Sequence, residues 1–269
     1  MRIISNTTEK ILSLQNLTMH FPEKQVLSGI DLDVYRGQII GYIGPNGAGK
    51  STTLKIMLGL VEGYGGTVEI FGEDISSASP NYKKRIGYVP ENADMYENLT
   101  AKEYLTFIGE LYGLEEHQAA NKALKMMEAF DLGHVFQKRI SAFSKGMRQK
   151  VLIISSLLHD PDLIFLDEPL NGLDANSVIL VKEILEELAL RGKTIFYSSH
   201  IMDVVEKISN RIVLLVDGQI AADGSFEELK QLSKEGSLEA IFNQITGYDQ
   251  HQDAAKLFVD TVLEGERND

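Results

Sequence analysis

Residues 44–52 combine a flexible backbone with one cation and two hydroxyls. Read in order they are Gly44, Pro45, Asn46, Gly47, Ala48, Gly49, Lys50, Ser51 and Thr52. This is the phosphate-binding loop pattern G-x-x-x-x-G-K-[ST], and it follows the strand-like apolar run of residues 38–43. Glycines let backbone N–H groups curl around a triphosphate, and a helix opening at Gly49 adds its positive dipole end. The alternative reading is a glycine-rich turn that holds no ligand.

Two side chains in this loop have chemistry suited to a nucleoside triphosphate. Lys50 supplies a mobile positive charge for the β- and γ-phosphates. The hydroxyl of Ser51 is a small, hard oxygen ligand of the kind that Mg²⁺ prefers. The loop therefore predicts that a triphosphate binds together with Mg²⁺.

A second group of candidate residues is a pair of acids after the apolar run of residues 163–166. Asp167 and Glu168 follow this run directly. Ligands of open α/β sheets bind at the carboxyl ends of the strands, so we expect these acids to reach the phosphate-binding loop. Asp167 would hold Mg²⁺ directly or through water, and Glu168 would polarise the water that attacks the γ-phosphate. The alternative is a pair of solvated acids in a turn.

Composition limits the partners of the chain. It has 269 residues, with 39 acidic and 26 basic side chains and a formal net charge of −13. This charge repels nucleic-acid phosphates, so we expect no nucleic-acid partner. Cysteine is absent, which excludes disulfides and thiolate metal sites.

The distribution of apolar residues predicts the cellular location of the protein. The apolar stretch of residues 151–158 is far shorter than the roughly 18–20 residues that span a bilayer. Residues 1–14 lack the continuous apolar region of a signal peptide. We therefore expect a cytoplasmic protein that does not itself cross a membrane.

The elements that must position these residues follow from the apolar pattern. The N-terminal part alternates apolar and polar residues, which is typical of half-buried antiparallel strands. Residues 101–132 and 146–159 have a helical pattern, and strands alternate with helices from Asp162 onward. Short apolar strands separated by helices predict a parallel sheet that is covered on both faces.

These patterns predict an α/β fold with a P-loop NTPase core and a mainly parallel sheet. An antiparallel β-subdomain would stand at the N-terminus, and a helical insertion would occupy about residues 91–160. We expect an ATPase domain over residues 1–225 and a C-terminal helical extension over residues 226–269, where apolar residues recur at helical spacing.

Three further motifs lie in order along the chain. Residues 143–149 read Phe-Ser-Lys-Gly-Met-Arg-Gln before the strand that ends in the two acids, Leu173-Asp174 follow the acids, and His200 follows residues 194–197. Together with the loop and the acids, these motifs resemble those of ATP-binding cassette (ABC) proteins, whose signature is Leu-Ser-Gly-Gly-Gln. The resemblance covers about residues 11–225 and implies an ATPase.

The resemblance also implies an assembly in which two cassettes, as a homodimer or a heterodimer, associate head to tail around two nucleotides. Ser144 and Gly146 would then contact the nucleotide held by the other subunit. His200 would contact the γ-phosphate and orient the attacking water. Phe21 would stack on adenine, with a role as a core residue as the alternative.

Two departures from the family pattern point to a subfamily. Glu91 stands where most relatives have Gln and would still bind Mg²⁺ or water, whereas Lys145 and Met147 replace a Gly and the Gln of the signature. Together with the helical extension, they resemble bacterial exporters of drugs, polysaccharides or lipids. A separate transmembrane permease subunit would then hold the chain on the inner face of the cell membrane. The alternatives are a soluble ABC ATPase acting on ribosomes or DNA, and a degenerate cassette with a regulatory role.

Overall fold

The strands of the described residues form two sheets. The computed structural model describes residues 9–92, 94–199, 201–233, 236–247 and 251–264. The smaller sheet is antiparallel, and its strand order is β2 (Lys24–Tyr35), β1 (Lys10–Phe21), β4 (Gly65–Ile70) and β5 (Glu73–Asp74). The six-stranded sheet has the order β10 (Gln219–Gly224), β9 (Arg211–Val216), β3 (Ile39–Ile43), β8 (Thr194–Ser198), β7 (Leu163–Asp167) and β6 (Ile86–Val89). Its ladders are parallel except for β10 with β9, so the predicted α/β class with an antiparallel N-terminal sheet is confirmed.

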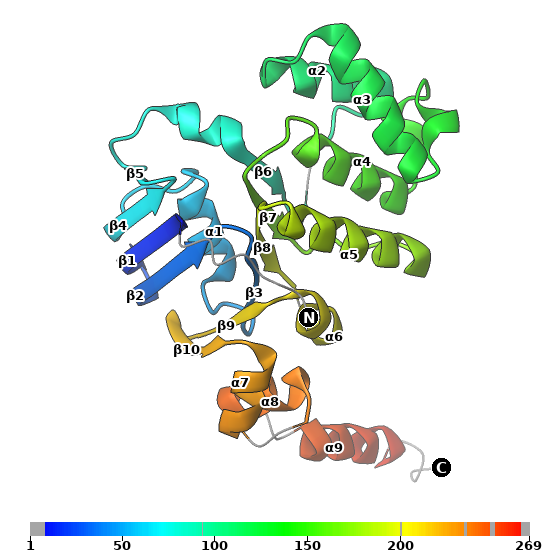
Figure 1. Cartoon of the computed structure of the whole chain (residues 1–269). Helices are drawn as coiled ribbons and strands as arrows, with labels where there is room; N and C mark the ends of the chain where they lie inside the picture. The colour runs from blue at the N-terminus through cyan, green and yellow to red at the C-terminus, as the bar shows by residue number, and fades with distance from the viewer. Residues whose placement is uncertain (1–8, 93, 200, 234–235, 248–250, 265–269) are drawn as a thin grey trace.

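Alternating side chains of the large sheet enter two separate cores. Leu163 and Phe165 of β7 join the core that contains the small sheet and α1 (Lys50–Met57), which lies between the two sheets (Figure 1). Ile164 and Leu166 join the core on the opposite face, which is covered by helices. Burial on both faces explains why this strand reads as a continuous apolar run.

A helical lobe occupies the chain between β6 and β7 (Figure 1). Its elements are α2 (Ala101–Leu111), α3 (Glu116–Ala129), the short 3₁₀ helices η2 (Gly133–Val135) and η3 (Ile140–Ala142), and α4 (Lys145–Leu157). Thr100 and Glu103 form a reciprocal capping box that begins α2, since each side chain accepts from the backbone N–H of the other. Another 3₁₀ helix, η1 (Pro80–Arg85), precedes β6.

The remaining helices are α5 (Ala175–Leu190), α6 (Met202–Ile208), α7 (Phe226–Ser233), α8 (Leu238–Thr246) and α9 (His251–Glu264). Leu238 and Ile241 of α8 are buried in the helix-covered core, and Glu206 of α6 accepts a hydrogen bond from the Leu238 N–H. In contrast, α9 projects from the body of the molecule (Figure 1). Among the described residues, no helix has the length and apolar character needed to cross a bilayer.

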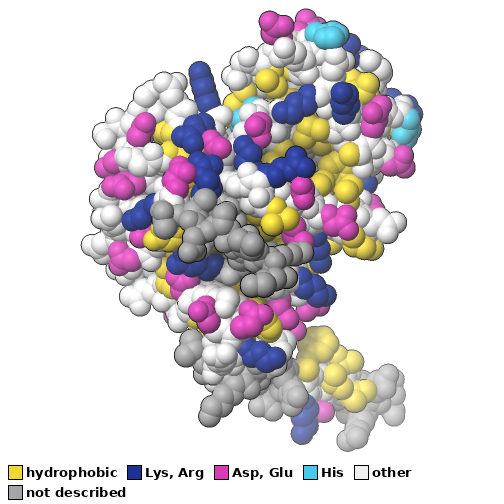
Figure 2. Space-filling model, in the orientation of Figure 1, with side chains coloured by type: hydrophobic (Ala, Val, Ile, Leu, Met, Phe, Trp, Pro, Cys, Tyr) yellow, Lys and Arg dark blue, Asp and Glu magenta, His cyan; other side chains and the backbone are white. Residues whose placement is uncertain are grey.

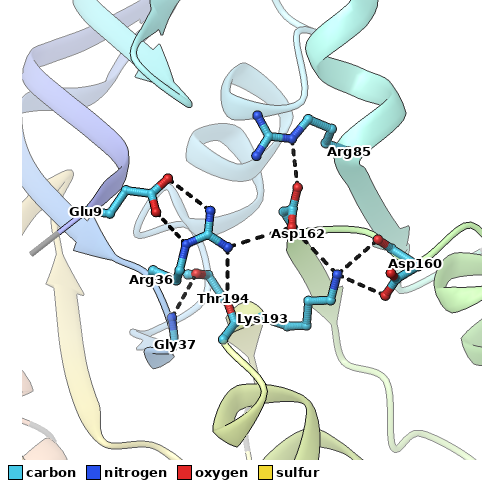
Figure 3. A network of polar contacts seen from close by, with 9 residues as sticks. Glu9, Arg36, Gly37, Arg85, Asp160, Asp162, Lys193 and Thr194 are labelled. Atoms are coloured by element: carbon cyan, nitrogen blue, oxygen red, sulfur yellow. Dashed lines mark hydrogen bonds and ion pairs between the residues drawn. The ribbon is translucent and has the colours of Figure 1, made fainter. Parts of the chain in front are cut away.

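Ion pairs join the amino-terminal ends of the parallel strands (Figure 3). Asp162, just before β7, lies 2.7 Å from Arg85, 3.6 Å from Lys193 and 3.8 Å from Arg36. Partial burial alone would raise the pKa of Asp162, but the hydrogen bond from Arg85 and the nearby cations outweigh it and hold this pKa below its usual value. The network therefore stabilises the edge of the sheet opposite to the carboxyl ends of the strands.

Candidate functional site

A cavity of about 410 Å³ lies at the carboxyl ends of the parallel strands. It brings together the loop before α1, the ends of β7 and β8, the segment after β6 and the start of β2. Its lining residues are Lys24, Val26, Asn46, Gly47, Gly49, Lys50, Ser51, Thr52, Glu91, Asp167, Glu168 and Ser198. The loop, the two acids and Glu91, which were each predicted from the sequence, therefore share one cavity.

The loop before α1 requires glycine at two positions for different reasons. Gly49 is the N-cap of α1 with φ 109°, and a Cβ there would lie 2.5 Å from the side chain of Leu27. A Cβ at Gly44 would lie 2.2 Å from the carbonyl oxygen of Leu215. The backbone of the loop is thus packed closely against β2 and β9, and the N-terminus of α1 faces the cavity.

Lys50 is the buried cation of the site. Its side-chain nitrogen donates hydrogen bonds to the carbonyl oxygens of Gly44 at 2.6 Å and Pro45 at 3.1 Å. Burial lowers the pKa of Lys50, and the negative charges of Glu168 and Asp167 act in the opposite direction. A partly desolvated ammonium group beside helix-terminal N–H groups is well suited to bind phosphate.

Asp167 is a buried carboxylate at the end of β7, paired in register with Ser198 of β8. Burial raises the pKa of Asp167, a hydrogen bond with Ser198 lowers it, and the charge of Glu91 raises it further. Removing a carboxylate from water in this way favours a bound cation beside it. The donor set of Ser51, Asp167 and Glu91 consists of the hard oxygen ligands that suit Mg²⁺.

Glu168 is held in an uncommon backbone conformation, with φ 49°. Its N–H donates to the carbonyl oxygen of Ser198 at 3.0 Å, and the Ser199 hydroxyl donates to Oε2 of Glu168 at 3.2 Å. Its side chain is buried at the cavity wall. This arrangement fixes one carboxylate oxygen next to the loop that carries Lys50.

Several of the sequence-predicted site residues are not among those that line the cavity. Ser144 and Gly146 begin α4, with Ser144 as the N-cap whose hydroxyl accepts from the Met147 N–H at 3.2 Å. Phe21 is 40% exposed at the end of β1, so its ring is accessible. His200 lies outside the described residues.

Three lining residues were missed from the sequence, namely Lys24, Val26 and Ser198. Lys24 pairs with Phe21 across the hairpin that joins β1 to β2. Ser198 had a usable signal, because it ends a buried strand that neighbours the strand ending in Asp167.

The fold and the cavity define a P-loop nucleotide-binding ATPase. A family model described as ABC transporter matches residues 27–171. ABC transporter ATP-binding protein NatA of Bacillus subtilis is 33% identical over 237 residues, which cover 86% of this chain and 96% of that protein. The chain belongs to the ATP-binding subunits of ABC transporters, and as such it binds and hydrolyses ATP.

Two further comparisons agree with this family. A fluoroquinolones export ATP-binding protein of Mycobacterium tuberculosis is 34% identical over 223 residues, covering 82% of this chain and 73% of that protein. A solved structure described as an ATP-binding subunit of an ABC transporter superposes with a TM-score of 0.82 at 31% identity, covering 88% of this chain and 99% of that one. The family, fold and enzyme class predicted from the sequence are therefore confirmed.

Proposed function

We propose that this chain drives export through a separate transmembrane permease, and that ATP binding joins it to a second cassette. The observation that carries the proposal is that Lys50 and the carboxylates of Asp167 and Glu168 line the same cavity. The direction of transport is supported by the similarity to the mycobacterial fluoroquinolones export protein. On this proposal the chain lies at the inner face of the membrane, bound to its permease.

The loop of residues 44–52 holds the triphosphate through its backbone N–H groups and Lys50. To reach the β- and γ-phosphates, the Lys50 ammonium group leaves the carbonyl oxygens of Gly44 and Pro45. Ser51, Asp167 and Glu91 would hold Mg²⁺, which supplies charge neutralisation at the phosphates when it is bound. Phe21 packs its exposed ring against adenine, where stacking is worth about 1–3 kcal/mol per base in single-stranded nucleic-acid complexes.

Glu168 is the proposed general base for the attacking water. The Ser199 hydroxyl donates to its carboxylate, and the Ser198 carbonyl accepts from its backbone N–H. These bonds favour one orientation of the carboxylate for accepting the proton of the water. His200 is proposed to contact the γ-phosphate beside this water. Phosphoryl transfer depends mostly on such positioning and on charge neutralisation.

The second cassette is proposed to contact this chain at α4. The helix has 13 residues, carries no acidic residue in its first turn and has Ser144 as its N-cap, so its N-terminus attracts an anion. Ser144 and Gly146 would contact the ATP held by the other subunit, and the reciprocal contact completes a homodimer or a heterodimer.

The permease is proposed to dock on the helical lobe. Large apolar side chains are exposed there, namely Tyr96, Phe107 and Leu111, and the rings of Tyr96 and Phe107 meet edge to face at 6.3 Å. Figure 2 shows hydrophobic side chains on the lobe that carries α2 to α4. An exposed apolar patch of this kind fits a membrane-protein partner.

The docking proposal is tested by Phe107→Asp in cells that contain the permease. We expect the tagged wild-type chain to co-purify from membranes with a transmembrane protein, and Phe107→Asp to lose it while retaining Mg²⁺-dependent phosphate release. Ile179→Asp is the matched control, because Ile179 is an exposed apolar residue of α5 outside the lobe. Equal recovery of the transmembrane protein with Phe107→Asp would contradict docking at this surface.

A further inference from the structure

We propose that Gln149 is a positioning residue that couples Glu168 to the ATP bound at the opposite site of the dimer. The Gln149 side chain is buried, and its amide nitrogen donates a hydrogen bond of 2.9 Å to the carbonyl oxygen of Pro169. Pro169 directly follows Glu168. The inference rests on the proposed function, because it uses Glu168 as the base and Ser144 as a contact to the other subunit's ATP.

The Pro169 carbonyl matters because of the backbone strain at Glu168. A non-glycine residue at φ 49° is disfavoured by about 1–3 kcal/mol and persists only where its neighbours hold it. On one side, the Glu168 N–H is held by the Ser198 carbonyl at 3.0 Å. On the other side, the Asn171 N–H donates to the Glu168 carbonyl oxygen at 3.2 Å. Pro169 has no N–H, so its part in holding the backbone is the hydrogen bond that its carbonyl oxygen accepts from Gln149.

Gln149 and Ser144 belong to the same helical segment. They are five positions apart in the sequence, which corresponds to about 7.5 Å along a helix axis. The first turn of α4 also packs tightly on the turn after Glu168, since a Cβ at Gly146 would lie 2.6 Å from the carbonyl oxygen of Gly172. A displacement of α4 by ATP bound against Ser144 is therefore transmitted to the Pro169 carbonyl and to the backbone of Glu168.

This coupling has a kinetic consequence that a purely structural role lacks. Binding of ATP at one site sets the position of Glu168 at the other, so hydrolysis by the full chain rises cooperatively with ATP concentration. Gln149 is not among the residues that line the cavity, so its removal leaves ATP affinity unchanged. A misplacement of about 1 Å in a catalytic group costs about 10²-fold in rate, so kcat falls by about 10- to 100-fold.

The first test is Gln149→Met in the full chain, because Met has similar volume and no hydrogen-bond donor. We expect the affinity for ATP and the melting temperature to stay close to those of the wild type, kcat to fall and the Hill coefficient to approach one. Ser156→Ala is the matched control on the same helix, since its hydroxyl donates to the Ile153 carbonyl within α4 at 2.8 Å. We expect the control to keep both kcat and cooperativity.

A second variant, Gln149→Glu, separates hydrogen bonding from packing. The ionised carboxylate has no proton to donate to the Pro169 carbonyl, whereas the protonated acid has one. The ratio of the variant's kcat to the wild-type kcat is therefore expected to rise as the pH falls. If Gln149→Met does not fold, this pH dependence tests the coupling role of the hydrogen bond.

Either of two results overturns the coupling role. One is a folded Gln149→Met with wild-type kcat and Hill coefficient, and the other is joint loss of stability and ATP affinity in both variants without recovery at low pH. Failure of the proposed function is distinguishable, because the wild-type chain itself would then hydrolyse ATP without forming a dimer in its presence.

Discussion

The ammonium nitrogen of Lys50 lies 2.6 Å from the carbonyl oxygen of Gly44, the residue that begins the phosphate-binding loop. The loop thus binds the side chain of its own lysine. The close approach of Gly44 to β9 and of Gly49 to β2 maintains the curved backbone of the loop. Burial lowers the pKa of Lys50, so the ammonium group is incompletely solvated before a phosphate arrives. The conformation of the phosphate-binding loop is therefore held by contacts within the protein.

The first prediction is that Lys50→Ala weakens ATP binding and abolishes turnover. Loss of a hydrogen bond to a charged group costs about 1.5–3 kcal/mol, which corresponds to about a 10- to 100-fold weaker affinity. Titration calorimetry with ATP and phosphate release measure the two effects. Lys84→Ala is the control, because Lys84 is exposed and is not among the lining residues. Unchanged turnover in Lys50→Ala would remove the role assigned to the loop.

The second prediction concerns Ser144. Ser144→Arg is expected to retain ATP binding by the monomer while blocking dimerisation and turnover, because a long side chain would occupy the contact with the partner's nucleotide. Mixing Ser144→Arg with Lys50→Ala should recover part of the activity, since one complete site combines an intact loop from one subunit with an intact signature from the other. No recovery in the mixture would argue against sites shared between subunits.

The third prediction assigns coupling to Glu91. This residue lines the cavity and precedes the helical lobe, so it joins the nucleotide site to the proposed docking surface. Glu91→Ala should leave the ATP affinity of the isolated subunit within a few-fold of the wild type and uncouple hydrolysis from transport in the assembled complex. Transport and ATPase assays in the same membranes test this. Full substrate-stimulated ATPase and full transport would leave Glu91 as an ordinary loop residue.

The fourth prediction is a pH-dependent loss of stability in Asp162→Asn. The pKa of Asp162 is lowered in the folded chain, so its ionised form stabilises the fold above the unfolded value of about 3.9 and this contribution is lost as the pH falls through the folded value. We expect Asp162→Asn to lower the free energy of unfolding by about 1 kcal/mol at neutral pH.

Urea denaturation at neutral and acidic pH measures this effect. The difference in the free energy of unfolding between wild type and Asp162→Asn should decrease on acidification. Asp160→Asn is the matched control, since the Asp160 side chain is 73% exposed and its ion pair is with Lys193. A difference that stays constant with pH would show that the charge of Asp162 does not act as described.

Much of the fold could be predicted because its signals are local. Continuous apolar runs marked β3, β7, β8 and β9, and the helical spacing of apolar residues marked the lobe and α5. The strand β10 was missed, because its residues alternate only between exposed and intermediate burial. The turn before it, Asp217 at φ 47° and Gly218 at φ 75°, is the Asp-Gly hairpin signal that would have identified the strand.

The candidate site was predictable where one motif supplies both the residue and its context. Lys50 and Ser51 belong to a loop with a fixed pattern, and Asp167 and Glu168 end a recognisable strand. Lys24 and Val26 enter the cavity only because the small sheet packs over the loop, which is a tertiary relationship without a local signal. The backbone strain at Glu168 could likewise not be predicted from the sequence. A positive φ at a non-glycine residue is maintained by tertiary contacts and is not determined by the residue type.

The measurement that tests the account most directly is the mass of Glu168→Gln in solution with and without ATP. Removing a positioned base slows a reaction by about 10²–10⁴-fold, so this variant should bind ATP without consuming it. Size-exclusion chromatography with light scattering is then expected to show a stable dimer in ATP and a monomer without it, whereas Lys50→Ala remains monomeric. A monomeric Glu168→Gln at every ATP concentration would contradict the ATP-dependent dimer.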